Sequence, residues 1–222
     1  MSMTRWMMIA ALAASSVGCV ANQGDAPVRF LDARTLKDEG GSCALGETQR
    51  PAGQLDVSGG QGYLVALRVE TNTVAREIRV GTTTVAGGGL SDFTFRELIL
   101  TYETSAGLVL PEEERIPLYA VFRPGTSADG SYAVLPAFGP EALTALSGVT
   151  APVTVLSTIK VAGVFSGGQK METNEITFPV TVINSGYVPG NNTCSRGGLP
   201  LEKSWTCGQI GQDNGPICPT TP

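Results

Sequence analysis

The sequence contains no histidine among its 222 residues, and only 16% of its side chains are charged. Without histidine the chain cannot form a Ser-His-Asp or Cys-His catalytic group, and it cannot bind zinc through imidazole. The formal net charge is −5, with 15 basic and 20 acidic residues. An acidic chain with few basic clusters is a poor ligand for DNA or RNA, so no nucleic-acid partner is expected.

Long hydrophobic runs are also missing. The longest apolar run near the N-terminus, Trp6 to Ala14, has nine residues, whereas a membrane-spanning helix needs about 20. The run follows Arg5 and is followed by small residues from Ser15 to Gly18. A short basic region, a short apolar region and a small-residue end are typical of a secretory signal peptide. Residues 1–18 are therefore predicted to be an export signal.

The end of this signal resembles the lipobox of bacterial lipoproteins, through Ser16-Val17-Gly18-Cys19. The resemblance covers about 19 residues, and it departs from the family pattern at Ser16, where leucine is usual. It implies that Cys19 is lipidated and becomes the mature N-terminus, so that the protein is anchored in the bacterial cell envelope. Val20, in place of an aspartate, points to the outer membrane. The alternative is ordinary cleavage after Ala13 or Ser16, which leaves Cys19 as a thiol.

The cysteine count fits this interpretation. Cysteines of exported proteins usually pair, and five cysteines leave one unpaired. If Cys19 carries lipid, the remaining four can form two disulfides in three connectivities; these four are Cys43, Cys194, Cys207 and Cys218. No C-x-x-C pair is present, so neither a zinc site nor a thioredoxin-like site is predicted. No metal and no cofactor are expected.

The rest of the chain predicts an all-β protein. Tyr63, Val65, Leu67 and Val69 alternate with other residues, as in a strand with one buried face. About eight such segments, separated by turn signals, predict an antiparallel β-sandwich of the immunoglobulin-like kind. The predicted divisions are a spacer over 19–53, the sandwich over 54–188 and a cysteine-rich tail over 189–222, stapled to the sandwich by disulfides. Two small β modules, split near 125–130, are the alternative.

Three local features are specific enough to test. The alternation from Asp92 to Tyr102 slips at Arg96, which predicts a β-bulge there, with a helix over 93–102 as the alternative. Pro140 after Gly139 predicts a short helix ending at Leu146. Pro179, inside a strand pattern over 175–182, predicts an edge strand or a bulge.

Candidate catalytic motifs have simpler structural interpretations. Ser157 and Lys160 match the S-x-x-K motif of penicillin-binding enzymes, but alternation in a strand sends them to opposite faces, and no K-T-G is present. Glu112 to Glu114 could supply the paired carboxylates of a glycosidase, although a solvated turn is the simpler prediction. Trp205, beside Cys207, is expected to pack on a disulfide rather than to stack on a sugar.

A second resemblance involves the end of the chain. The strand ITFPVTV, followed by a glycine-rich cysteine tail with Gly211-Gln212-Asp213, looks like β-rich bacterial lipoproteins, a resemblance that implies no particular activity. We therefore expect a lipid-anchored, non-enzymatic envelope protein with a structural or partner-binding role and no catalytic residue. Its partners would be the membrane, through Cys19, and an envelope or extracellular protein or glycan. The alternatives are a carbohydrate-binding module and a carboxylate-based glycan hydrolase.

Overall fold

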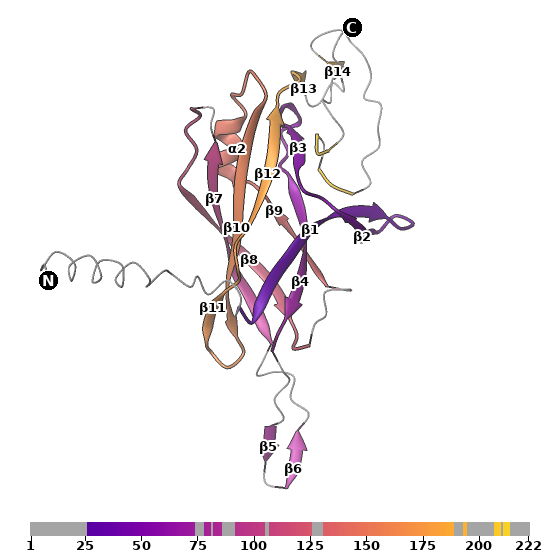
Figure 1. Ribbon diagram of the computed structural model, residues 1–222, viewed down its shortest axis with the longest axis vertical. Coiled ribbons are helices and arrows are strands. Elements are labelled where there is room, and N and C mark those ends of the chain that lie inside the picture. Colours follow the sequence, from indigo (N-terminus) through magenta and orange to yellow (C-terminus); the bar gives the residue numbers. More distant parts are fainter. Residues whose placement is uncertain are drawn as a thin grey trace, which may run out of the picture.

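The computed structural model describes residues 26–73, 78–80, 82–85, 92–104, 107–125, 131–188, 193–194, 207–209 and 211–213. The predicted signal peptide 1–18, the lipidation residue Cys19, Trp205 and Cys218 lie outside these residues. The described chain is mostly β-strand, in two main sheets, with a single short α-helix (Figure 1). The all-β class predicted from the alternation is therefore confirmed. Among the described residues, no helix is long and apolar enough to cross a membrane.

The smaller main sheet has four antiparallel strands in the order β2-β1-β4-β9. Their bounds are β1 Val28–Asp38, β2 Cys43–Gln49, β4 Leu64–Thr71 and β9 Tyr132–Pro136. Residues 28–49 thus lie almost entirely in this sheet, so the spacer predicted for 19–53 is wrong from Val28 onward. The strand pattern of β1 is broken because its register shifts between Phe30 and Ala33.

The larger sheet has the order β3-β12-β10-β7-β8, with β11 paired to β10 beside it. The bounds are β3 Gly53–Asp56, β7 Phe93–Thr104, β8 Glu113–Phe122, β10 Val153–Phe165, β11 Lys170–Glu172 and β12 Ile176–Ile183. All pairs are antiparallel except β3 with β12, which is parallel. The chain can make this parallel pair because β4 to β11 all lie between the two strands in sequence.

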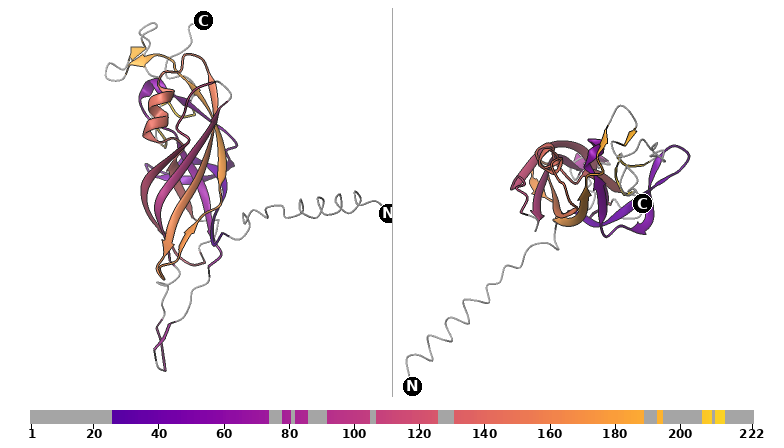
Figure 2. Two further views of the ribbon diagram at one scale, coloured as in Figure 1. Left: turned by 90° about the vertical axis from the view of Figure 1, so that its left-hand side faces the viewer. Right: turned by 90° about the horizontal axis from the view of Figure 1, so that it is seen from above.

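Smaller elements extend from both ends of the body (Figures 1 and 2). The hairpin of β5 and β6 lies beyond one end, and that of β13 and β14 beyond the other. A 3-10 turn, η1, follows β3, and the helix α2 follows β9. The bounds are β5 Ile78–Val80, β6 Thr83–Val85, β13 Tyr187–Val188, β14 Thr193–Cys194, η1 Val57–Gly59 and α2 Pro140–Leu146.

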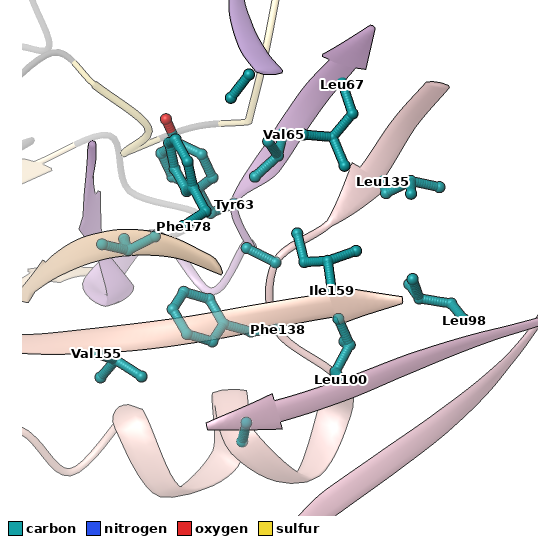
Figure 3. Packing of buried hydrophobic residues seen from close by; sticks show 14 of the residues in the cluster. Tyr63, Val65, Leu67, Leu98, Leu100, Leu135, Phe138, Val155, Ile159 and Phe178 are labelled. Carbon is teal, nitrogen blue, oxygen red and sulfur yellow. The ribbon is translucent and has the colours of Figure 1, made fainter. Parts of the chain in front are cut away.

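One hydrophobic cluster fills the space between the two main sheets. Figure 3 shows Val65 and Leu67 of β4 across from Leu98 and Leu100 of β7, with Ile159 of β10 near both. All five side chains are at most 2% exposed, and burying each one stabilises the fold by about 2 kcal/mol. The cluster contains residues from before and after 125–130, so the alternative of two separate β modules is not supported.

Two of the local features predicted from the sequence are present in the structure. Arg96 is exposed between buried Phe95 and outward-facing Glu97, and the register with β10 shifts at this point, so the predicted bulge is confirmed. The helix from Pro140 to Leu146 is also confirmed. The strand β12 pairs with β3 only from Val180 onward. Among the described strands, its first half, which contains Pro179, pairs with β10 alone, and that register shows no bulge. Pro179 precedes that pairing, so its missing N–H leaves no gap in the β3 ladder.

Candidate functional site

A disulfide ties the C-terminal tail to the first hairpin of the fold. Cys43 and Cys207 are 164 residues apart in sequence, and their Cα atoms are 5.6 Å apart. The sequence predicted disulfides among four cysteines without their connectivity, and the structure supplies one pair. The backbone of Cys194 lies in β14, but its side chain, like the whole of Cys218, lies outside the described residues. The second disulfide therefore stays a prediction.

Beyond Cys207, the chain pairs with the edge strand β3. We call residues 207–209 and 211–213 the tail segment. Asp56 N donates to Gly211 O at 2.9 Å, Asp213 N donates to Gln54 O at 2.8 Å, and an antiparallel bridge joins Leu55 to Gln212. Gly211 has a φ of 88°, and a Cβ there would lie 2.5 Å from Asp56 O. Only glycine fits this close approach.

The same segment also bonds to β4 in the other sheet. The amide of Gln212 accepts from Leu64 N at 3.0 Å and donates to Leu64 O at 2.8 Å. Since β3 belongs to the larger sheet and β4 to the smaller one, the tail segment joins the two sheets at this edge. In the sequence, Gly211-Gln212-Asp213 is part of a resemblance that implies no role for it.

Asp213 is the charged centre of this contact. Its carboxylate accepts from the Tyr63 hydroxyl at 2.9 Å and from Gln54 N at 3.2 Å, and it pairs with Arg50 Nη1 at 2.9 Å. Burial raises the pKa of the Tyr63 hydroxyl, and the negative charge of Asp213 raises it further. Tyr63 therefore stays a neutral donor to Asp213 across the physiological pH range.

A pocket of about 190 Å³ lies between the tail segment and the smaller sheet. Leu64, Val65 and Ala66, which are consecutive residues of β4, contribute to its lining. We call it the tail pocket. It is lined by Arg34, Leu36, Arg50, Leu64, Val65, Ala66, Phe178, Cys207, Gln212 and Asp213.

Two arginines and one carboxylate line this pocket. Arg34 is held by Asp32 at 3.0 Å, and its guanidinium also donates to the carbonyl of Glu47. The carboxylate of Asp32 also forms an ion pair with Arg68 Nε at 2.5 Å and accepts a hydrogen bond from Gln49 Nε2 at 2.8 Å. Burial raises the pKa of the Asp32 carboxyl, but the hydrogen bonds from Arg68, Arg34 and Gln49 outweigh burial and leave the pKa lowered. Asp32 therefore stays ionised at neutral pH and fixes the position of Arg34.

The glutamates considered as a catalytic pair have different environments. Glu112 and Glu113 are exposed, whereas Glu114 is 7% exposed. Glu114 accepts from the backbone N of Glu141 at 2.8 Å and of Ala142 at 3.1 Å. The prediction of a solvated turn is thus wrong for Glu114, which caps the N-terminus of α2.

A local signal for this burial was present in the sequence. Glu114 shares the period of Ile116 and Leu118, which face the core. The hydroxyl of Tyr102 adds a third donor to Glu114, at 2.7 Å. Burial raises the pKa of Tyr102, so its hydroxyl keeps the proton that it donates.

The S-x-x-K match is divided between two faces of β10, as predicted. Ser157 is fully buried, and its hydroxyl donates to Ala137 O at 2.5 Å. Lys160 lies on the other face and pairs with Glu172 at 3.1 Å and Glu175 at 3.4 Å. Since a nucleophilic serine needs its lysine within hydrogen-bond reach, this pair cannot act as that catalytic group.

Within the described ranges, no group of three or more Cys, Asp or Glu side chains could hold a metal ion. The tail pocket, which is lined by Arg34, Arg50 and Asp213 among others, is the candidate functional site. No protein-family model matches the sequence, and no curated protein or solved structure matches the chain.

Proposed function

We propose that this protein is a lipid-anchored protein of the bacterial cell envelope, with a structural or partner-binding role. The observation that carries the proposal is the Cys43–Cys207 disulfide, which joins the first hairpin to the tail across 164 residues. Disulfides of this structural kind persist in oxidising compartments and are rare in the cytosol. The disulfide thus supports export, the step that the signal over residues 1–18 would direct.

The entry of the chain into the fold suits an anchor at Cys19. Seven peptide steps separate Cys19 from Ala26, and they span at most about 25 Å. Asn72 N donates to Pro27 O at 2.8 Å, so the chain enters beside the end of β4. This entry lies at the opposite end of the body from β13 and β14 (Figure 1). We infer that the entry end faces the membrane and that the end with β13 and β14 points away from it.

The buried carboxylates favour a structural interpretation over a hydrolytic one. Glu114 binds the N-terminus of α2. Asp56 is fully buried and accepts from Ser58 N at 3.1 Å, Ser58 Oγ at 2.6 Å and Ser185 N at 3.1 Å. Both carboxylates therefore bind donors of the fold itself. The immunoglobulin-like arrangement of the strands stays a prediction of the sequence.

The experiment that tests this proposal is the intact mass of the protein from the membrane fraction, reduced and non-reduced. We expect a mature N-terminus at Cys19 with added acyl mass, and a gain of about four hydrogens on reduction if two disulfides are present. A Cys19→Ala variant should lose the acyl mass and leave the membrane. A Cys43→Ala variant is the control, because it should keep the acyl mass while its reduction adds about two hydrogens fewer. An unlipidated product that starts at another residue contradicts the anchor.

A further inference from the structure

The hairpin of β5 and β6 projects from the end of the body at which the chain enters the fold (Figures 1 and 2). We propose that this hairpin rests on the surface of the bilayer that holds the lipid of Cys19, as a second, non-covalent contact with the membrane. The inference rests on the proposed lipid anchor, and it names a further part of the chain that meets lipid.

The start of the fold and the start of the hairpin segment lie side by side. Val28, the first residue of β1, pairs with Thr71, the last residue of β4. Asn72 N then donates to Pro27 O at 2.8 Å. The chain that comes from Cys19 therefore arrives beside the point where β4 leads on to β5. A membrane that holds Cys19 is closest to this end of the body.

The tether and the hairpin segment have a similar reach. The seven peptide steps from Cys19 to Ala26 span at most about 25 Å, and the nine steps from Thr73 to Thr82 span at most about 30 Å. With Cys19 in the bilayer, the tether holds the start of β1 within reach of the hairpin's own length. Because the hairpin projects from that same end, it lies in the space between the body and the lipid.

The register of the hairpin divides its residues between two faces. Residues that pair across an antiparallel ladder share a face, and successive residues alternate between faces. Ile78 pairs with Val85, Arg79 with Thr84 and Val80 with Thr83. One face is therefore apolar apart from a single threonine, whereas the other consists of Arg79 and Thr84. The apolar face has the composition that contact with a lipid surface requires.

The hairpin has no other sheet to support it within the described part of the chain. There, β5 and β6 pair with each other and with no other strand. A two-stranded hairpin by itself is only marginally stable in water, and it needs a surface to pack on. The bilayer is the apolar phase that the tether brings within reach. Contact with it would cover the apolar face and stabilise the hairpin.

The charge of the hairpin also suits a lipid surface. Arg79 is the only charged residue of β5 and β6, which contain no acidic residue, in a chain whose net charge is −5. Anionic lipid headgroups repel acidic surfaces, and they attract arginine on the polar face of an interfacial segment. This part of the chain can therefore approach headgroups without the repulsion that the acidic remainder would meet.

The test uses the lipidated mature protein in vesicles of phosphatidylethanolamine and phosphatidylglycerol, with or without bromine on the acyl chains. Bromine quenches the fluorescence of an indole that touches the acyl region, so Val80→Trp reports on the hairpin, with the unsubstituted protein as the background for Trp205. The control is Val109→Trp, because Val109 is 87% exposed and lies five residues before Glu114, which caps α2 at the opposite end (Figure 1). We expect bromine to lower the added emission of Val80→Trp by about half and to leave that of Val109→Trp unchanged.

Matched charge substitutions test which face meets the lipid. In the Val80→Trp protein, Ile78→Asp should abolish the quenching, whereas Thr84→Asp should leave most of it, since Thr84 belongs to the opposite face. A protein that carries no acyl group and does not float with vesicles overturns both the anchor and the hairpin contact. A protein that floats, but is quenched equally through Val80→Trp and Val109→Trp, overturns the hairpin contact alone. Equal effects of the two aspartates also overturn it.

Discussion

Gln212 bonds to Leu64 with both atoms of its side-chain amide, although 148 residues separate the two. The amide occupies the N–H and the C=O that a neighbouring strand would otherwise pair. One side chain thus substitutes for a short piece of strand beside the beginning of β4. With the backbone bonds from the tail segment to β3, this contact closes the edge where the two sheets meet.

Gln212→Ala should therefore destabilise the fold. The substitution leaves the N and O of Leu64 without these partners, in a region where Gln212 is 8% exposed. Unpaired groups of this kind cost about 1–3 kcal/mol each when buried. Urea unfolding should show a lower midpoint with an unchanged slope. Gln169→Ala is the control, because Gln169 is exposed and lies in the β10–β11 turn. Equal midpoints for the two variants would contradict a structural role for the amide.

The disulfide should contribute more than any single hydrogen bond. For a closed loop of 164 residues, the chain-entropy model gives about 5 kcal/mol as an upper value. The double variant Cys43→Ser, Cys207→Ser should lose about 2–5 kcal/mol of unfolding free energy. The measurement is urea unfolding of the variant beside oxidised and reduced wild type. A variant as stable as the oxidised wild type would show that hydrogen bonds alone hold the tail segment.

Glu114→Gln should weaken the attachment of α2. The carboxylate accepts from two backbone N–H groups and the Tyr102 hydroxyl, and an amide presents one oxygen and an unwanted donor instead. The expected loss is about 1–3 kcal/mol in the free energy of unfolding. Glu113→Gln is the matched control, because Glu113 is the exposed neighbour, and its change should stay within about 0.5 kcal/mol. Thermal unfolding of both variants tests this, and similar losses would contradict the capping role.

Asp32 should make stability depend on pH. Its folded pKa lies below the ordinary value of 3.8, because hydrogen bonds from Arg68, Arg34 and Gln49 outweigh the effect of burial. A lowered folded pKa contributes stability that is present above 3.8 and is lost as the pH falls through the folded value. Asp32→Asn should therefore be less stable than wild type at pH 7, and the difference should shrink in acid. Unfolding midpoints of both proteins at about pH 7 and 3 measure it, and a difference that stays constant would exclude this linkage.

The strand and helix predictions were based on patterns among residues that are close together in the sequence. The inward row of β4 and the helix start at Pro140 depend on neighbours only a few residues away. The bulge at Arg96 could be predicted for the same reason, because one extra residue changes which positions of the strand face inward before and after it. The strand β1 was missed because its register shift separates Phe30 from Ala33 and breaks the period of two.

The pairing of distant residues was decided only by the tertiary structure. Four cysteines allow three connectivities, and nothing local chooses Cys207 as the partner of Cys43. The burial of Glu114 could be inferred from its period, but its role needed the N-terminus of α2 beside it. The tail pocket likewise exists only because the tail segment returns to β3 and β4. Alternation fixes which face of a strand a side chain takes, whereas hydrogen bonds and disulfides between distant segments depend on how the sheets come together.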